Sequence, residues 1–182
     1  MKNNKNDLIQ LIPGNPGTSF VICLLYALNH KYGLKIPNKD QLPIFTRGIV
    51  NSHQVFHSGI LNLVAQKYKH NISAFTNNQM AKKLAEGEIN KKRVSFSLMK
   101  LNSENIKKLL DKFQYVTLSV DIYFFYPYYH DYHFCCLGKN GKNYSVFEPK
   151  RGITKKLSTG ELEQMISSVE KDLSDATLAF CC

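Results

Sequence analysis

A histidine and a glutamate stand at the two ends of a predicted β-hairpin in the last third of the chain. The segment from His133 to Glu148 contains Asn140-Gly141, a pair that favours a type I′ turn because both central residues need positive φ. With this turn, His133 faces Glu148 directly across the hairpin, with the two Cβ atoms about 5 Å apart. An imidazole held by a carboxylate forms the base and its orienting group in a nucleophilic triad. A nucleophile elsewhere in the chain would complete such a triad.

A long buried helix is predicted near the start of the chain, over 19–32. Its residues 20–28 are apolar without interruption, so no face of the helix is suited to water. Thr18 or Ser19 is a suitable N-cap, and Gly33 is placed to end the helix. A turn-rich stretch of prolines and glycines leads into it.

The start of this helix is where a nucleophile is expected. The partial positive charge of a helix N-terminus stabilises a thiolate, and the free N–H groups of the first turn can stabilise an oxyanion. A cysteine would suit this position, and the residue present is Ser19. Cys23, one turn further on, is an alternative nucleophile, but its place within the apolar run favours a core residue.

The remaining elements predict an α+β domain. Helices are predicted at 55–69, 78–86, 104–113 and 159–171. Strands are predicted at 94–101, 115–120, 176–181 and in the two arms of the hairpin at 132–148. This order predicts an N-terminal buried helix packed on a mostly antiparallel sheet, in a single domain over 1–182.

In its order of motifs the chain resembles the papain-like cysteine peptidase superfamily, most closely the double-glycine-type bacteriocin-processing peptidases and the YopT-type effector proteases. In both, a Gly-containing turn presents the catalytic cysteine at the start of a long buried helix. A His later opens a strand, and an Asp or Asn followed by Pro comes after it. The matching segments here are Gly17-Thr18-Ser19-Phe20, His133 to Gly138, and Phe147-Glu148-Pro149.

This resemblance covers 13–33 and 104–181 and implies a papain-like fold. Residues 34–103 match neither branch and are expected to form a helical insertion or a substrate-side region.

The resemblance also implies a triad of Ser19 as nucleophile position, His133 as base and Glu148 as orienting group. Glu148 stands where Asp or Asn is usual, and a carboxylate one methylene longer can still hold the imidazole. Ser19 is the larger departure, because a site shaped for thiolate–imidazolium chemistry rarely runs on a hydroxyl. The simplest interpretation is a Cys-to-Ser replacement that silences the enzyme. A naturally inactive descendant ranks second, and a working Ser–His–Glu hydrolase third.

Two further sets of residues are assigned roles around this triad. Gln10 and Asn15, upstream of the nucleophile position, are the candidates for the family's oxyanion helper, although Asn15 serves equally well as a turn former. In the aromatic-rich loop before the hairpin, Tyr128, Tyr129 and Tyr132 are candidate substrate-binding residues, with core packing as the equal alternative.

The other histidines and the cysteines do not indicate a metal or cofactor site. His53 and His57 are four residues apart, which suits a metal, but no acidic third ligand accompanies them, so we expect surface or core histidines. His130 is a weaker candidate base, because its orientation is unconstrained. The five cysteines have neither zinc-site spacing nor a disulfide framework, which indicates a reducing compartment.

The net charge of +10 is distributed unevenly along the chain. Residues 82–112 carry nine basic and four acidic side chains, whereas 157–182 carry one Lys against five acids. A solvated Lys-rich face is the favoured interpretation, with contact to an anionic membrane surface or to an acidic protein as the alternatives. Because the set is almost entirely Lys rather than Arg, a nucleic-acid partner is not expected.

No targeting or membrane segment is predicted. The first twelve residues lack the apolar core of a signal peptide, and the longest apolar run, 20–28, is too short to span a bilayer. We expect a cytoplasmic protein or a bacterial effector that is delivered into host cells.

These observations predict a cysteine protease that acts on a specific protein partner. A glutamine deamidase or transglutaminase is the alternative on the same fold, because both reactions pass through the same acyl-enzyme. A non-catalytic pseudoenzyme that serves as a binding module is the alternative from another class.

Overall fold

The computed structural model describes residues 18–36, 38–52, 56–121, 123, 125, 128, 132–172 and 178–182. The α-helices are α1 (Thr18–Tyr32), α2 (Gln41–Val50), α3 (Phe56–Tyr68), α4 (Gln79–Glu86), α5 (Ser103–Phe113) and α6 (Thr159–Asp172), with one 3₁₀ turn, η1 (Asn38–Asp40). The strands are β1 (Ile72–Thr76), β2 (Val94–Leu98), β3 (Tyr115–Asp121), β4 (Tyr132–Asn140), β5 (Asn143–Glu148), β6 (Ile153–Leu157) and β7 (Leu178–Cys181).

All seven of these strands join one mixed sheet in the order β2-β1-β7-β3-β4-β5-β6. The pairing of β1 with β2 is parallel, and the other five pairings are antiparallel. The α+β class and the mostly antiparallel sheet predicted from the sequence are therefore confirmed. Residues 34–103 contribute helices and also β1 and β2, which extend the same sheet.

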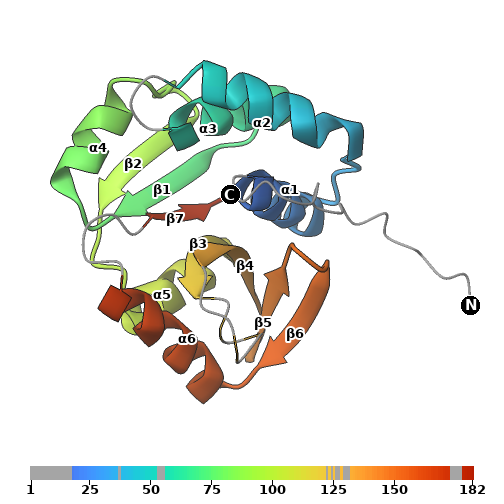
Figure 1. The fold of residues 1–182 in the computed structure, drawn as a ribbon, viewed down its shortest axis with the longest axis vertical. Coiled ribbons are helices and arrows are strands. Elements are labelled where there is room, and N and C mark those ends of the chain that lie inside the picture. The colour runs from blue at the N-terminus through green and yellow to red at the C-terminus, as the bar shows by residue number, and fades with distance from the viewer. Residues whose placement is uncertain are drawn as a thin grey trace, which may run out of the picture.

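Helices cover both faces of the sheet and enclose two clusters of buried side chains. In Figure 1, α2, α3 and α4 lie beside β1 and β2, α5 and α6 lie beside β3 to β6, and α1 lies between these two halves. Neighbouring positions of β4 alternate between the clusters: Cys136 packs with α1 and α3, whereas Cys135 and Leu137 pack with α5 and α6.

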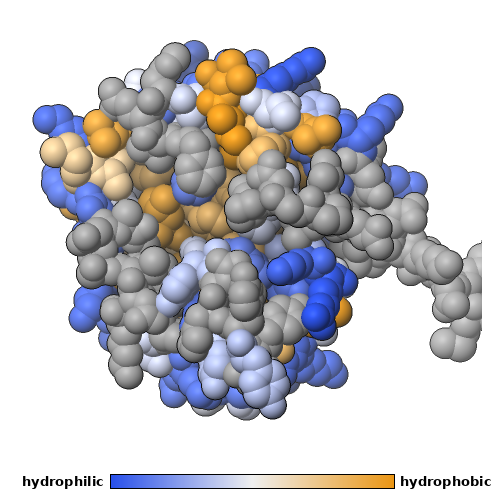
Figure 2. Space-filling view, viewed as in Figure 1, coloured by the Kyte–Doolittle hydropathy of each residue, from blue (hydrophilic) through white to orange (hydrophobic). Residues whose placement is uncertain are grey.

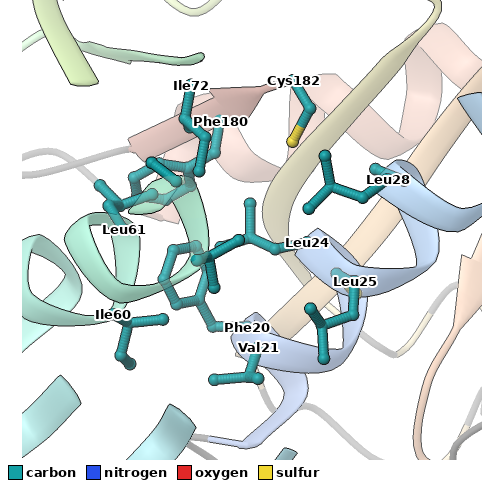
Figure 3. Close-up of a cluster of buried hydrophobic side chains, with 14 of the residues drawn as sticks. Phe20, Val21, Leu24, Leu25, Leu28, Ile60, Leu61, Ile72, Phe180 and Cys182 are labelled. Carbon is teal, nitrogen blue, oxygen red and sulfur yellow. The ribbon is translucent and has the colours of Figure 1, made fainter. Parts of the chain in front are cut away.

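The first helix is buried as predicted. Every residue from Thr18 to Leu28 is buried, and Gly33 follows the helix with φ +65°, a left-handed conformation that ends it. Figure 3 shows Phe20 and Leu24 of α1 directed toward side chains of α3 and β7, and Leu28 directed toward Cys182. Thr18 and Ser19 both lie inside the helix, so the position that caps it falls outside the described residues.

The hairpin has a different register from the predicted one. Asn140 pairs with Asn143, so Gly141 and Lys142 are the central residues of the turn, rather than Asn140 and Gly141. Gly141 has φ +59° and Lys142 does not have positive φ. Positive φ at the first central position only is the pattern of a type II′ turn, in which a single glycine is enough.

Three elements were not predicted: α2, β1 and β6. Helix α2 contains Pro43 and Gly48, both of which weaken a helical pattern. Strand β6 has a polar sequence and is mostly exposed, so it lacks an apolar strand pattern. Gly48 is required by close packing of α2 on α3, because a Cβ there would overlap Ile60. Helix α5 begins one residue earlier than predicted and is capped by Asn102, whose side chain accepts a hydrogen bond from the N–H of Asn105.

Apolar and polar side chains separate on the surface. Figure 2 shows apolar residues gathered over the centre and upper part of the face, on the side of α2 and α3, while the outer rim is mostly hydrophilic. Leu42, Ile49 and Val50 of α2 are among the exposed apolar residues. Of the helices in the described part of the chain, none has both the length and the apolar character needed to cross a membrane.

Candidate active site

The start of α1 contacts β4 at the point where β5 separates from it. The β4–β5 pairing runs from Asn140 with Asn143 to Cys136 with Phe147. Extended by two residues, this register would set Phe134 opposite Pro149, which has no N–H to donate. The β4–β5 pairing ends before Phe134, so the N–H and C=O groups of Phe134 on this side of β4 are available to another element.

Helix α1 bonds to this backbone with two side chains that are one turn apart. The Phe134 N–H donates to Ser19 Oγ at 3.3 Å, and the Phe134 carbonyl accepts from Cys23 Sγ at 3.3 Å. These two hydrogen bonds attach the N-terminal half of α1 to the strand position directly after His133.

His133 and Glu148 form a buried hydrogen-bonded pair. The distance between His133 Nε2 and Glu148 Oε1 is 2.9 Å, and the two residues are 8% and 0% exposed. The sequence predicted that these two residues are directly opposite each other across the hairpin, and this prediction is wrong. In the observed register Glu148 lies opposite Cys135, so His133 is its diagonal neighbour.

The carboxylate of Glu148 is also held by the turn that follows β5. Its two oxygens accept hydrogen bonds from the N–H groups of Lys150, at 2.6 Å, and Arg151, at 3.1 Å. Backbone donors of this kind favour the ionised carboxylate and fix its position. Glu148 therefore both closes the turn and orients His133.

The hydrogen bond to Glu148 determines which nitrogen of the His133 imidazole can act as a base. When Nε2 carries the proton that Glu148 accepts, Nδ1 is the nitrogen that can take a proton from a nucleophile. Ser19 Oγ is 3.3 Å from the Phe134 nitrogen, and that nitrogen is roughly 2.4 Å from the Cα of His133 by standard geometry. Ser19 Oγ is thus less than about 6 Å from the Cα of His133.

The hydrogen bonds of the described residues do not include one between Ser19 and His133. Strand alternation explains this. His133 lies on the same face of β4 as Cys135, and Glu148 on the same face of β5 as Val146, which is the face covered by α5 and α6. Ser19 reaches β4 through the strand backbone instead. Catalytic contacts are often longer before substrate binds.

Cys23 has the properties of a core thiol. It is fully buried, and burial raises the pKa of its thiol, with neighbouring Cys136, Cys135 and Glu148 adding to the effect. Its Sγ–H donates to the Phe134 carbonyl. Both observations favour a protonated structural cysteine over a nucleophile.

His57 is a buried neighbour of the site. It lies 6% exposed among three aromatic rings, with centroid distances of 4.6 Å to Phe20, 5.2 Å to Phe134 and 5.4 Å to Phe180. Burial lowers its pKa to about 3, so the imidazole is neutral at physiological pH. Among the residues with described positions, no group of three or more His, Cys, Asp or Glu side chains could hold a metal ion.

The remaining predicted residues are only partly placed. Gln10, Asn15 and Tyr129 lie outside the described residues, as do His53 and His130. The two other tyrosines of the predicted substrate loop differ in exposure: Tyr128 is 99% exposed, and Tyr132 is half-buried in the first position of β4.

The sequence analysis did not identify Phe134 as the residue that links α1 to the histidine strand. Its role depends on backbone atoms, which the residue type does not reveal. The signal that would have indicated it is Pro149, because a proline opposite a strand position cannot donate a ladder hydrogen bond to the carbonyl of that position.

Comparison of the chain with protein-family models, with curated proteins and with solved structures found no match.

Proposed function

We propose that this chain is a papain-like hydrolase of the acyl-transfer type, with residue 19 at the nucleophile position, His133 as base and Glu148 as orienting group. The observation that carries the proposal is the buried hydrogen bond between His133 Nε2 and Glu148 Oε1, next to the strand position that holds Ser19 Oγ. A histidine oriented by an ionised carboxylate beside the start of a buried helix is the arrangement that nucleophilic catalysis needs.

With Cys at position 19, the reaction follows from the roles of these groups. The thiolate is stabilised by the N-terminus of α1 and by the Phe134 N–H, and it attacks the carbonyl carbon of the substrate. His133 Nδ1 takes the thiol proton and gives it to the leaving amine, while Glu148 accepts the Nε2–H and stabilises the imidazolium. Water then releases the acyl group as a carboxylic acid.

The substrate that we propose is a protein. A peptide bond gives proteolysis, and a glutamine side-chain amide gives deamidation by the same steps. The chain with Ser19 is proposed to be inactive, because a hydroxyl is much less acidic than a thiol and needs a stronger base contact than this site has.

A non-catalytic binding module is the second candidate. The observation that favours it is the burial of Ser19, which is 2% exposed and whose hydroxyl accepts the Phe134 N–H. A serine in this arrangement is a sufficient structural partner for the strand end, without chemistry.

Alkylation of a Ser19→Cys variant separates the two candidates. Burial raises the thiol pKa of all five native cysteines, so the unmodified chain is the matched control and should take up little iodoacetamide in its folded state. We expect one added label on residue 19, with a rate whose pH midpoint lies below the free-thiol value of about 8.5. Adding His133→Ala should move this midpoint upward, since the imidazolium no longer stabilises the thiolate.

The same variant then serves in a turnover assay on protein substrates. The hydrolase proposal predicts cleavage or deamidation by the Ser19→Cys form only. Identical labelling profiles with and without His133, with a midpoint near the free-thiol value, would favour the binding module.

A further inference from the structure

Strand β2 forms one edge of the sheet, and its hydrogen bonds to β1 show which backbone groups face outward. The N–H of Ile72 donates to the Arg93 carbonyl, and the N–H of Met99 donates to the Thr76 carbonyl, both at 2.9 Å. Because backbone groups alternate along a strand, residues 93, 95, 97 and 99 bond to β1. The N–H and C=O groups of the even-numbered residues point away from the sheet.

Most of these outward-facing backbone groups make no backbone hydrogen bond within the described part of the chain. The N–H of Val94 donates to the Asn90 carbonyl. The N–H and C=O groups of Phe96 and Leu98 take part in none of the backbone hydrogen bonds found between described residues. The Phe96 side chain is buried in the core and holds the strand in place, whereas Leu98 is 48% exposed. The edge is thus already extended and fixed, which lowers the entropic cost of adding a strand.

The charged residues nearest to β2 in the sequence on each side are basic. Val94–Leu98 contains no charged residue, while Lys91, Lys92 and Arg93 precede it and Lys100 follows shortly after. None of these four basic side chains belongs to an ion pair between described residues.

The opposite edge of the sheet differs. Strand β6 carries Lys155 and Lys156 within the strand itself, where charged side chains oppose the addition of another strand. The β2 edge has no such protection.

We propose that the β2 edge binds an extended acidic segment of a partner protein, which adds to the sheet as a further strand. Phe96 and Leu98 each offer one donor and one acceptor to its backbone, and backbone pairing provides most of the affinity in this mode of recognition. Five strand residues span roughly 17 Å. Acidic side chains at both ends of the segment therefore meet the basic residues at both ends of β2, in either strand direction. Ser19 and His133 take no part in this interaction.

A synthetic peptide, Glu-Glu-Val-Thr-Val-Thr-Val-Glu-Glu, is a probe for this edge. Its binding to the full chain is measured by fluorescence anisotropy and by amide hydrogen exchange. We expect saturable binding that weakens with salt, and slower exchange at the Phe96 and Leu98 amides. The Ser97 amide faces β1 and should be protected with or without peptide.

Leu98→Pro is the decisive variant, because it removes an outward N–H and no hydrogen bond of the sheet. We expect it to weaken binding by about tenfold or more, whereas Leu98→Ala, which keeps the N–H, should change it less than about threefold. A peptide with Lys in place of each Glu should bind at least about tenfold more weakly.

Three results would overturn the proposal: no saturable binding up to about 1 mM peptide, equal binding by the Leu98→Pro and Leu98→Ala proteins, or equal binding of the basic peptide. Dimerisation of the chain that Leu98→Pro abolishes would assign the edge to a second copy instead of an acidic partner.

Discussion

Protonation of His57 is expected to destabilise the fold at mildly acidic pH. Burial lowers its pKa from 6.5 to about 3, so between about pH 3 and pH 6.5 the folded state binds fewer protons than the unfolded state. A base whose pKa is lowered by folding stabilises the folded state fully only at pH values above its unfolded-state pKa. That contribution is then lost as the pH falls through 6.5 toward 3.

The size of the effect follows from these two pKa values. Each pH unit within the window removes about 1.4 kcal/mol of unfolding free energy, so lowering the pH from 7 to 5 removes about 2 kcal/mol. Small domains have a stability of about 5 to 15 kcal/mol, so this loss is large enough to measure. His57 lies on α3, so a charge there weakens the packing of α3 against Phe20 of α1, Phe134 of β4 and Phe180 of β7.

Urea unfolding followed by circular dichroism at pH 7, 6 and 5 measures the effect. His57→Phe and His57→Leu both remove the titrating group. One keeps a planar ring and the other places a branched aliphatic side chain among the three phenylalanine rings, so the two variants change the packing in different ways. Each variant is compared with itself across pH, which cancels the constant cost of repacking. His30, whose pKa burial also lowers, is present in all three proteins and cancels as well.

We expect the unmodified chain to lose about 2 kcal/mol more than either variant between pH 7 and pH 5. Parallel pH profiles for the three proteins would refute the assignment of a neutral buried imidazole. This effect also sets the pH range in which alkylation of the Ser19→Cys variant should be measured. The best range is above about pH 6, where the neutral His57 still contributes to the stability of the fold.

Two further substitutions test the packing and the site. Gly59→Ala should lower the free energy of unfolding by about 1 to 3 kcal/mol in urea unfolding, because the added methyl group overlaps the Gly48 carbonyl oxygen and the Ser52 hydroxyl. Gly160→Ala is the matched control and should be nearly neutral, because no atom lies within 4 Å of the added methyl group. Glu148→Ala should lower the free energy of unfolding by at least about 3 kcal/mol, because it removes the acceptor for three hydrogen bonds. Glu148→Gln keeps one acceptor oxygen and should lower it less. Equal losses for the two variants would show that the carboxylate is not held by these donors.

Elements that have their own local signals could be predicted from the sequence. Helix α1 is apolar over nine consecutive residues and ends at a glycine in the left-handed conformation, so both its burial and its end could be predicted. Helix α5 has an amphipathic pattern, and its predicted start differs by one residue from the observed start at Ser103. These signals depend on residues close together in the chain.

Elements that depend on tertiary packing could not be predicted. Helix α2 contains Pro43 and Gly48, and only the close approach of α3 explains why Gly48 is suitable there. Strand β1 is buried between β2 and β7, and its sequence is too short to distinguish it from part of a helix. The contact of Ser19 with the Phe134 N–H joins residues 115 positions apart and uses a backbone atom, so no residue pattern indicates it.

The His133–Glu148 pair shows how a correct contact can follow from a wrong register. The observed turn centres on Gly141 and Lys142, which shifts β5 by two residues relative to the predicted pairing. Because side chains alternate with a period of two, a shift of two keeps Glu148 on the same face as His133, and a shift of one would have moved it to the other face. The Glu side chain is long enough to reach a diagonal neighbour, as the 2.9 Å hydrogen bond shows. An aspartate is one methylene shorter and would have to reach the same imidazole from the same backbone position, which gives a structural reason for Glu at position 148.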